Sequence, residues 1–216
     1  RQSRIGLAGY DACHELSACM LAATLGAGSR ARILVAGGGG TGSEVLAAGR
    51  LEPDWTFVVV DPSAPMLDLA EGRIAGAGLS DRTEAVLGAV ADLPAGRTFD
   101  AASLIGVLHH LPGDAAKAAI LRDIADRLTP GAPLILAGNC RAYAAEPLLM
   151  AAWGNRWRLN GASEDEIAVK LGKILQGADP PASDEAVEAL LADAGFGAPK
   201  RFFASLFWGA WICTRL

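Results

Sequence analysis

The chain has little basic charge for its size and no long apolar run. It contains 19 Lys and Arg against 24 Asp and Glu among 216 residues, which gives a net charge of −5 and an isoelectric point near 5.2. Nucleic acids and anionic membranes are bound by clustered Lys and Arg, so we expect neither as a partner. No apolar run reaches the roughly 18–20 residues of a membrane-spanning helix, and residues 1–16 lack the apolar core of a signal peptide. These absences predict a cytoplasmic protein.

Cysteine is sparse and scattered. Cys13, Cys19, Cys140 and Cys213 include no Cys-x-x-Cys pair. Zinc sites and disulfide frameworks normally show closely and regularly spaced cysteines. We therefore expect reduced thiols and no bound metal.

Aliphatic and small residues dominate what the chain does contain. Hydrophobic residues make up 51% and charged residues 20%, a composition that suits helices packed on a buried parallel sheet. Short β-branched runs, such as residues 33–36 and 57–60, alternate with helix-like stretches, such as residues 43–50 and 64–75. Because parallel strands need long crossover connections, this alternation predicts an α/β, doubly wound, Rossmann-like sheet.

A single domain is expected over residues 1–216, since the length is short for two. We expect four parts in chain order. An N-terminal helix lies in residues 1–30, and a core of alternating strands and helices follows in residues 31–139. An inserted helical cap takes residues 140–182, and a last helix with two closing strands takes residues 183–216. The closing strands have too few residues between them for a crossover helix. They are therefore predicted to be antiparallel.

A glycine-rich turn follows the first predicted strand, in the segment ILVAGGGGTGSE at residues 33–44. Between a strand and a helix, glycines let the backbone approach a ligand while helix N–H groups point outward. The G-x-G-x-x-G pattern of dinucleotide-binding turns is fitted by Gly37, Gly39 and Gly42. An alternative G-x-G-x-G pattern is fitted by Gly38, Gly40 and Gly42. Spacing alone leaves the identity of the nucleoside cofactor open.

An acidic residue, Asp61, ends the second predicted strand. At this position a carboxylate can accept hydrogen bonds from the two ribose hydroxyls of a bound nucleoside. The following Pro62 and Ser63 leave a second interpretation open, in which Asp61 only caps the turn or the next helix.

Further segments carry a resemblance to a known family. They are DPSAPML at residues 61–67, GAVADLP at residues 88–94 and the stretch at residues 99–138 that contains GVLHHLPG. Together with the glycine turn they resemble segments of class I S-adenosylmethionine-dependent methyltransferases, and the resemblance covers nearly the whole chain. It implies a seven-stranded, mostly parallel sheet with an antiparallel last strand, and S-adenosylmethionine as the cofactor.

The resemblance also implies a set of cofactor-binding residues. Asp61 would hold the ribose, Met66 would pack near the adenine, and Asp92 would accept a hydrogen bond from the adenine amino group. The N-terminal helix that carries Tyr10 would cover the cofactor. The full set is Tyr10, Gly38, Gly40, Gly42, Asp61, Pro62, Met66, Asp92, Leu93 and Gly106.

One position departs from the family pattern. The family usually has an acidic residue two positions before the first glycine of its motif, and this chain has Ala36 there. The resemblance assigns the missing carboxylate to the amine of the cofactor's methionine part, so cofactor affinity or orientation could differ. The departure leaves a non-catalytic cofactor-binding or scaffold protein open as an alternative.

His109 and His110 are the candidate catalytic residues. They follow the fourth predicted strand, at the edge where open α/β sheets bind ligands. Methyl transfer needs in-line positioning and, for a hydroxyl or amine nucleophile, a base, and a neutral imidazole is a suitable base near pH 7. In the alternative interpretation one of the rings only caps the turn or packs.

Aromatic and guanidinium side chains are concentrated in the predicted cap, at Tyr143, Trp153, Arg156, Trp157 and Arg158. They could hold a flat or anionic substrate, or they could anchor the cap to the core. The aromatic closing strands could in addition provide the edge of a homodimer.

We therefore expect a methyltransferase that acts on an O, N or C nucleophile of a small molecule. Two alternatives stay open besides the scaffold protein. The closing segment FFASLFWGAW loosely resembles the carboxy-S-adenosylmethionine synthase branch of the family. A nicotinamide oxidoreductase is disfavoured by the segment around Asp92 and by the antiparallel closing strand.

Overall fold

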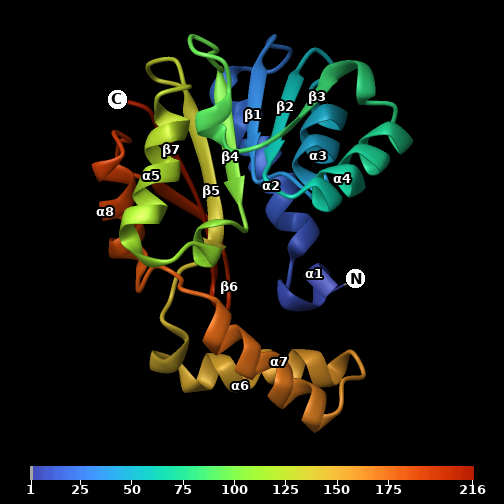
Figure 1. Cartoon of the computed structure of the whole chain (residues 1–216), viewed down its shortest axis with the longest axis vertical. Coiled ribbons are helices and arrows are strands. Elements are labelled where there is room, and N and C mark those ends of the chain that lie inside the picture. The colour runs from blue at the N-terminus through green and yellow to red at the C-terminus, as the bar shows by residue number, and fades with distance from the viewer. Residues whose placement is uncertain (1) are drawn as a thin grey trace.

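A computed structural model describes residues 2–216 as a seven-stranded sheet with helices on both faces and a helical cap beyond one end (Figure 1). The strands are β1 (Arg32–Ala36), β2 (Thr56–Asp61), β3 (Thr83–Leu87), β4 (Ala101–Ile105), β5 (Pro133–Asn139), β6 (Lys200–Ser205) and β7 (Trp208–Thr214). The helices are α1 (Gln2–Gly6), α2 (Tyr10–Leu25), α3 (Ser43–Leu51), α4 (Ala64–Gly76), α5 (Gly113–Ala125), α6 (Pro147–Leu159), α7 (Glu164–Gly177) and α8 (Asp184–Asp193).

The sheet has the strand order β3-β2-β1-β4-β5-β7-β6. Strands β1 to β5 pair in parallel, whereas β7 runs antiparallel between β5 and β6, with Trp211 opposite Leu136. The predicted α/β doubly wound fold, with its antiparallel closing strand and its helical cap at α6 and α7, is confirmed. Within residues 2–216, no helix is both long enough and apolar enough to cross a membrane.

Apolar side chains fill the space on both faces of the sheet. Along β1, Leu34 and Ala36 pack on one face with residues of α5 and α8, while Ile33 and Val35 pack on the other with residues of α2, α3 and α4. Successive strand residues point to opposite faces, so a strand covered on both sides reads as an unbroken apolar run. This is why the central strands could be located from the sequence.

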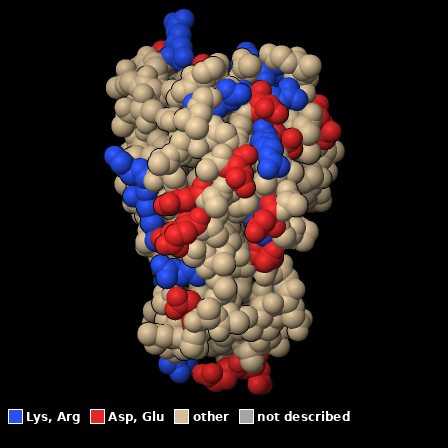
Figure 2. All heavy atoms as spheres, turned by 90° about the vertical axis from the view of Figure 1, so that its left-hand side faces the viewer, with Lys and Arg blue, Asp and Glu red and all other residues tan. Residues whose placement is uncertain are grey.

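Charged side chains of both signs lie outside this core. On the face that carries α5 and α8, Asp and Glu are interspersed with Lys and Arg, and no continuous basic surface forms there (Figure 2). This distribution agrees with the low basic charge of the sequence.

The N-terminal segment contains one helix more than expected. α1 ends at Gly6, and α2 begins after Gly9, whose φ of 79° is left-handed. Glycine adopts that conformation without a steric penalty, so the chain changes direction there. As a result α1 leaves the sheet and lies between the core and the cap (Figure 1).

The cap is anchored to α1 by three of its predicted aromatic and guanidinium residues. Trp153 Nε1 donates to the carbonyl oxygen of Gly6 at 2.7 Å, and Arg156 Nε donates to that of Ile5 at 2.8 Å. Trp157 packs against Ile5 in a small buried cluster. For Arg156 and Trp157, the anchoring role is therefore the one that the structure shows.

A buried lysine fixes the end of the cap against α5. Lys117 is 1% exposed, and its Nζ donates to Asp179 Oδ2 at 2.8 Å, a pairing that holds the pKa of Asp179 below its ordinary value. The same oxygen accepts from the Gly113 N–H at 2.7 Å. The Asp179 N–H in turn donates to the carbonyl oxygen of His109 at 2.8 Å. The pair thus ties the cap to the turn that carries the candidate catalytic histidines.

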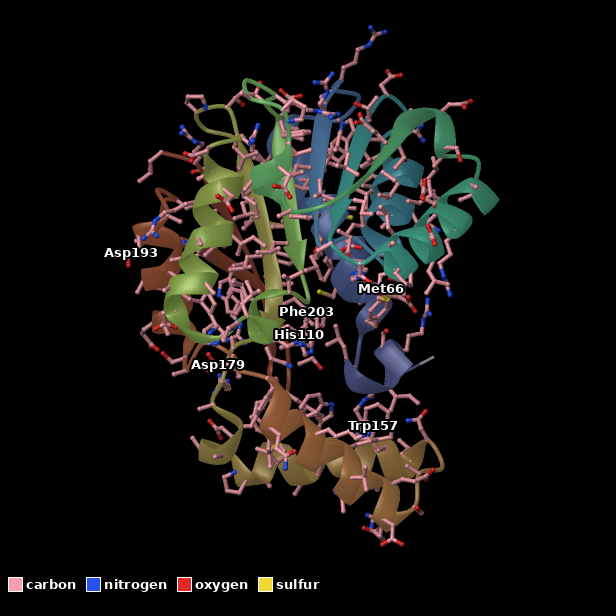
Figure 3. All side chains as sticks on the ribbon, viewed as in Figure 1. Met66, His110, Trp157, Asp179, Asp193 and Phe203 are labelled. Carbon is pink, nitrogen blue, oxygen red and sulfur yellow. The ribbon has the colours of Figure 1, made fainter. Side chains whose placement is uncertain are left out.

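Replacing Asp179 with Ala is expected to lower the free energy of unfolding by about 1–3 kcal/mol, because it leaves the buried Lys117 ammonium without its partner. Urea unfolding followed by circular dichroism measures the change. Asp193→Ala is the matched control, since Asp193 is exposed at the end of α8 (Figure 3) and its loss should change stability by less than about 0.5 kcal/mol.

A double variant tests the physical reason for this loss. Adding Lys117→Met to Asp179→Ala removes the unpaired charge and should recover part of the lost stability. A double variant less stable than Asp179→Ala alone would contradict the pairing.

Candidate active site

A cavity of about 420 Å³ opens between the core, the N-terminal helices and the cap. It lies at the carboxyl ends of the parallel strands, where open α/β sheets bind ligands, and its volume is typical of small-molecule pockets. Most of its lining residues come from four parts of the chain: the glycine turn after β1, the turn after β4, the start of the chain through α2, and the cap. Met66 and His110 lie at the end of the core that is nearest the cap (Figure 3).

The glycine turn is held in place by its own backbone. The Gly37 N–H donates to the carbonyl oxygen of Val60 at 2.8 Å, and the Gly40 N–H donates to that of Met66 at 2.6 Å. A Cβ at Gly40, whose φ is 95°, would lie 2.8 Å from the Met66 Cε. The positive φ favours glycine at this position, and the Met66 methyl group would have to move to admit a Cβ.

Gly38 and Gly42 face the core instead of the cavity. A Cβ at Gly38 would lie 2.6 Å from a Val35 methyl carbon and 2.8 Å from one of Val59, and a Cβ at Gly42 would lie 3.3 Å from Ile74. These two glycines allow close packing of the turn, and their part in cofactor binding stays a prediction. The glycines of this turn that line the cavity are Gly37, Gly39 and Gly40.

Asp61 fastens the glycine turn to β2. Its Oδ2 accepts from the Gly39 N–H and its Oδ1 from the Ser63 N–H, both at 2.9 Å. The side chain is buried and is not among the residues that line the cavity. The capping interpretation therefore describes its contacts in this structure. Since each carboxylate oxygen can accept a second hydrogen bond, ribose binding stays a prediction.

Three more of the expected cofactor residues lie outside the cavity. Pro62 and Asp92 are exposed, while Leu93 is buried in the core. Asp92 Oδ2 accepts from the Ala89 N–H at 2.8 Å, a bond within its own turn. Their contacts with a nucleoside stay predictions. The expected site residues that the fold does bring together around the cavity are Tyr10, Gly40, Met66, Gly106, His109 and His110.

Tyr10 connects α2 to the glycine turn. Its hydroxyl forms hydrogen bonds with Thr41 Oγ1 at 2.5 Å and with Ser43 Oγ at 3.2 Å. The first residue of α2 is therefore in contact with the glycine turn, and the expectation that this helix covers the cofactor stays a prediction.

Two buried titratable residues that the sequence analysis did not single out also line the cavity. His14 Nε2 lies 3.9 Å from Glu44 Oε2. Burial lowers the pKa of His14 to about 4 and raises the pKa of Glu44 to about 7. Because the imidazole is neutral at neutral pH, this contact is not an ion pair. Two features of the sequence could have pointed to them. His14 lies four residues after Tyr10 on the same helix, and Glu44 is an acidic residue directly after the glycine turn.

His109 and His110 occupy a 3₁₀ turn, Leu108–His110, with ring centroids 4.2 Å apart. His109 is buried, packs edge-on against Trp208, and has an Nδ1 without a partner among the described residues. Burial, and secondarily the neighbouring imidazole, lower the pKa of His109 to about 3, and burial also lowers the pKa of His110. His110 is exposed. A base of very low pKa accepts a proton weakly, so His110 is the better placed of the two.

The part of the cavity wall that the structure describes contains no Lys or Arg. Arg158 is exposed and lies 3.6 Å from Glu164 at the surface. Tyr143 and Trp153 do line the cavity, and Asn139 Nδ2 donates to the Tyr143 hydroxyl at 2.7 Å. The described residues also hold no group of three His, Cys, Asp or Glu side chains arranged to bind a metal ion.

Comparison with known proteins finds a family match for part of the chain. Residues 35–134 match the family model of a methyltransferase domain. These 100 of the 216 residues resemble a methyltransferase domain. No curated protein matches the chain.

Solved structures share the fold of this chain. Mitomycin 7-O-methyltransferase is 20% identical, with a TM-score of 0.67 over 94% of this chain and 54% of that one. An N,N-8-amino-8-demethyl-D-riboflavin dimethyltransferase of Streptomyces davawensis is 22% identical, with a TM-score of 0.63 over 92% of this chain and 53% of that one. An O-methyltransferase from neocarzinostatin biosynthesis is 21% identical, with a TM-score of 0.63 over 94% of this chain and 57% of that one. Its structure is a complex with S-adenosyl-L-homocysteine and 1,4-dihydroxy-2-naphthoic acid. The chain thus spans little more than half the length of these proteins.

The three histidines of this chain, His14, His109 and His110, should all be neutral at pH 7. In an NMR titration of the imidazole resonances, each should titrate below the ordinary histidine pKa of about 6.5. The resonances of the two buried rings should move only near pH 3–4 or at acid unfolding. Assignment uses His→Gln variants at each position, and a His109 resonance that titrates near pH 6.5 would contradict the burial argument.

Proposed function

We propose that this protein is an S-adenosylmethionine-dependent methyltransferase that acts on an O, N or C nucleophile of a small molecule. The observation that carries the proposal is a single cavity in which the glycine turn of a methyltransferase domain meets a histidine turn and an aromatic cap. Such a cavity can hold a cofactor at one end and an acceptor molecule at the other.

The residues around the cavity fit this cofactor in shape and charge. Gly39 and Gly40 present backbone that a Cβ would obstruct, and Met66 lies directly beside them. The cofactor carries a positive sulfonium and an ammonium group, and the described cavity wall contains the carboxylate of Glu44 and no cation. Bound there, the cofactor supplies an electrophilic methyl group on a good leaving group.

The roles of the chain's own residues follow from their positions. The glycine turn and Met66 hold the nucleoside part, while Asp61 keeps the turn in place and Asp92 lies further along the same edge of the sheet. His110 accepts the proton of an attacking hydroxyl or amine. His109 positions its neighbour, since its carbonyl oxygen accepts from Asp179 and its ring packs on Trp208.

The wall of the cavity favours an uncharged, flat acceptor. Tyr143, Trp153 and Trp208 contribute aromatic side chains, and no guanidinium or ammonium group of the described wall could pair with an anion. The same feature disfavours a carboxylated cofactor, whose additional carboxylate would lack a partner. It therefore supports methyl transfer over the carboxy-S-adenosylmethionine synthase alternative.

Calorimetric titration with S-adenosylhomocysteine tests the cofactor assignment, after mass spectrometry of any ligand released on denaturation. The wild-type protein should bind with a micromolar dissociation constant. Asp61→Ala should weaken binding at least 10-fold, because both the turn anchor and the ribose acceptor are lost. Asp68→Ala, an exposed position on α4, should leave binding unchanged. Absence of binding to the wild-type protein would support a scaffold instead.

His110→Gln should lower kcat by roughly 100-fold with a hydroxylated aromatic acceptor, because it removes the general base. The acceptor is selected by radiolabelled methyl transfer to a panel of phenols, naphthols and aromatic amines. Binding of S-adenosylhomocysteine to this variant should stay at the wild-type level. An unchanged kcat would assign proton removal to solvent.

A further inference from the structure

Glu44 is a carboxylate inside the cavity without a cationic partner in the described chain. It lies in the first turn of α3, two residues after Gly42, and its side chain is 11% exposed. The nearest titratable nitrogen belongs to His14, and burial keeps that imidazole neutral. The carboxylate accepts a hydrogen bond from its own backbone N–H but has no counter-charge. A buried charge without a counter-charge is costly, so this position indicates a missing positive charge.

His14 provides a second, independent sign of a ligand at the same place. It is 5% exposed and lines the cavity from α2, and its Nδ1 has no partner among the described residues. A neutral imidazole has one acceptor nitrogen. The two helices therefore bring a carboxylate and an unpaired imidazole to one wall, where a group with several N–H donors and a positive charge would satisfy both.

An ammonium group has these properties, with three N–H donors and a unit charge. The glycine turn that would hold the nucleoside part lies next to Glu44 along the chain, and Thr41 of that turn lines the cavity as well. β1 offers no acidic group of its own, because Ala36 is buried in the core and does not line the cavity.

We propose that Glu44, supported by His14, binds the α-ammonium group of the cofactor's methionine part. This assignment rests on the proposed function and deepens it by naming a residue for that end of the cofactor. Glu44 thus supplies from α3 the negative charge that β1 lacks at Ala36. The bound ammonium gives the buried carboxylate its counter-charge, and His14 keeps the carboxylate away from water.

A pair of ligands separates ammonium binding from nucleoside binding. S-adenosylhomocysteine carries the ammonium group, whereas 5′-methylthioadenosine shares the nucleoside and the thioether but lacks the amino-acid part. Calorimetry at a pH above the Glu44 pKa of about 7 compares both ligands. Glu44→Gln should weaken S-adenosylhomocysteine binding roughly 10- to 100-fold and leave 5′-methylthioadenosine binding unchanged.

Glu71→Gln is the matched control, because it makes the same chemical change at an exposed position of α4 and should alter neither affinity. Equal weakening of both ligands by Glu44→Gln would show that Glu44 only shapes the turn, and would overturn the assignment. Unchanged affinity for S-adenosylhomocysteine would overturn it as well. A wild-type protein that binds neither ligand would instead remove the proposed function together with this inference.

Stability of the ligand-free protein provides a second readout. Burial disfavours the charged carboxylate. At a pH above the Glu44 pKa of about 7, Glu44→Gln should therefore raise the Tm of the ligand-free protein by roughly 2–4 °C. A variant with higher Tm and weaker S-adenosylhomocysteine binding has lost a ligand contact, not its fold. A lower Tm with weaker binding of both ligands would show a structural role only.

Discussion

The position of the glycine turn against the end of β2 is the constraint on which the site depends. One carboxylate, Asp61, accepts the N–H of Gly39, and the backbone of β2 accepts the N–H of Gly37. These bonds direct the turn past Met66 and set the point at which α3 begins. Since α3 carries Glu44 and the turn carries Thr41, the same bonds place the cavity's carboxylate and the hydroxyl that contacts Tyr10.

The second determinant is the low polarity of the cavity. Desolvation keeps His14 and His109 neutral, so the carboxylate of Glu44, in spite of its raised pKa, is the main charge of the described wall. Charges interact more strongly where water is excluded. A cofactor with positive groups and an uncharged acceptor therefore match this environment, whereas an anionic acceptor would lose its hydration without gaining a partner.

Contacts between distant parts of the sequence close the cavity. Trp153 and Arg156 of the cap hold the carbonyl groups at the end of α1, and Lys117 holds Asp179 on the far side. The cap thus touches the core at both of its ends. The histidine turn lies beside one of these contacts, because Asp179 also donates to the carbonyl oxygen of His109.

Local sequence determined the elements of this fold. Unbroken apolar runs located the central strands, glycine and Pro-Gly turns ended the helices, and a short connection made the last two strands antiparallel, since these signals depend on neighbouring residues. The glycine turn, Met66 and the histidine pair were also recognisable, because each has a compact motif. α1 was not recognisable, because a helix of five residues is too short to show a hydrophobic periodicity.

Tertiary structure alone decided which of these residues share a cavity. It turned Gly38 and Gly42 toward the core, used Asp61 as an anchor of the turn, and distinguished an exposed His110 from a buried His109. It also brought His14 and Glu44 together from separate helices. Burial and desolvation depend on residues far away in the chain, so a sequence can supply a carboxylate or an imidazole but only the folded molecule sets its charge.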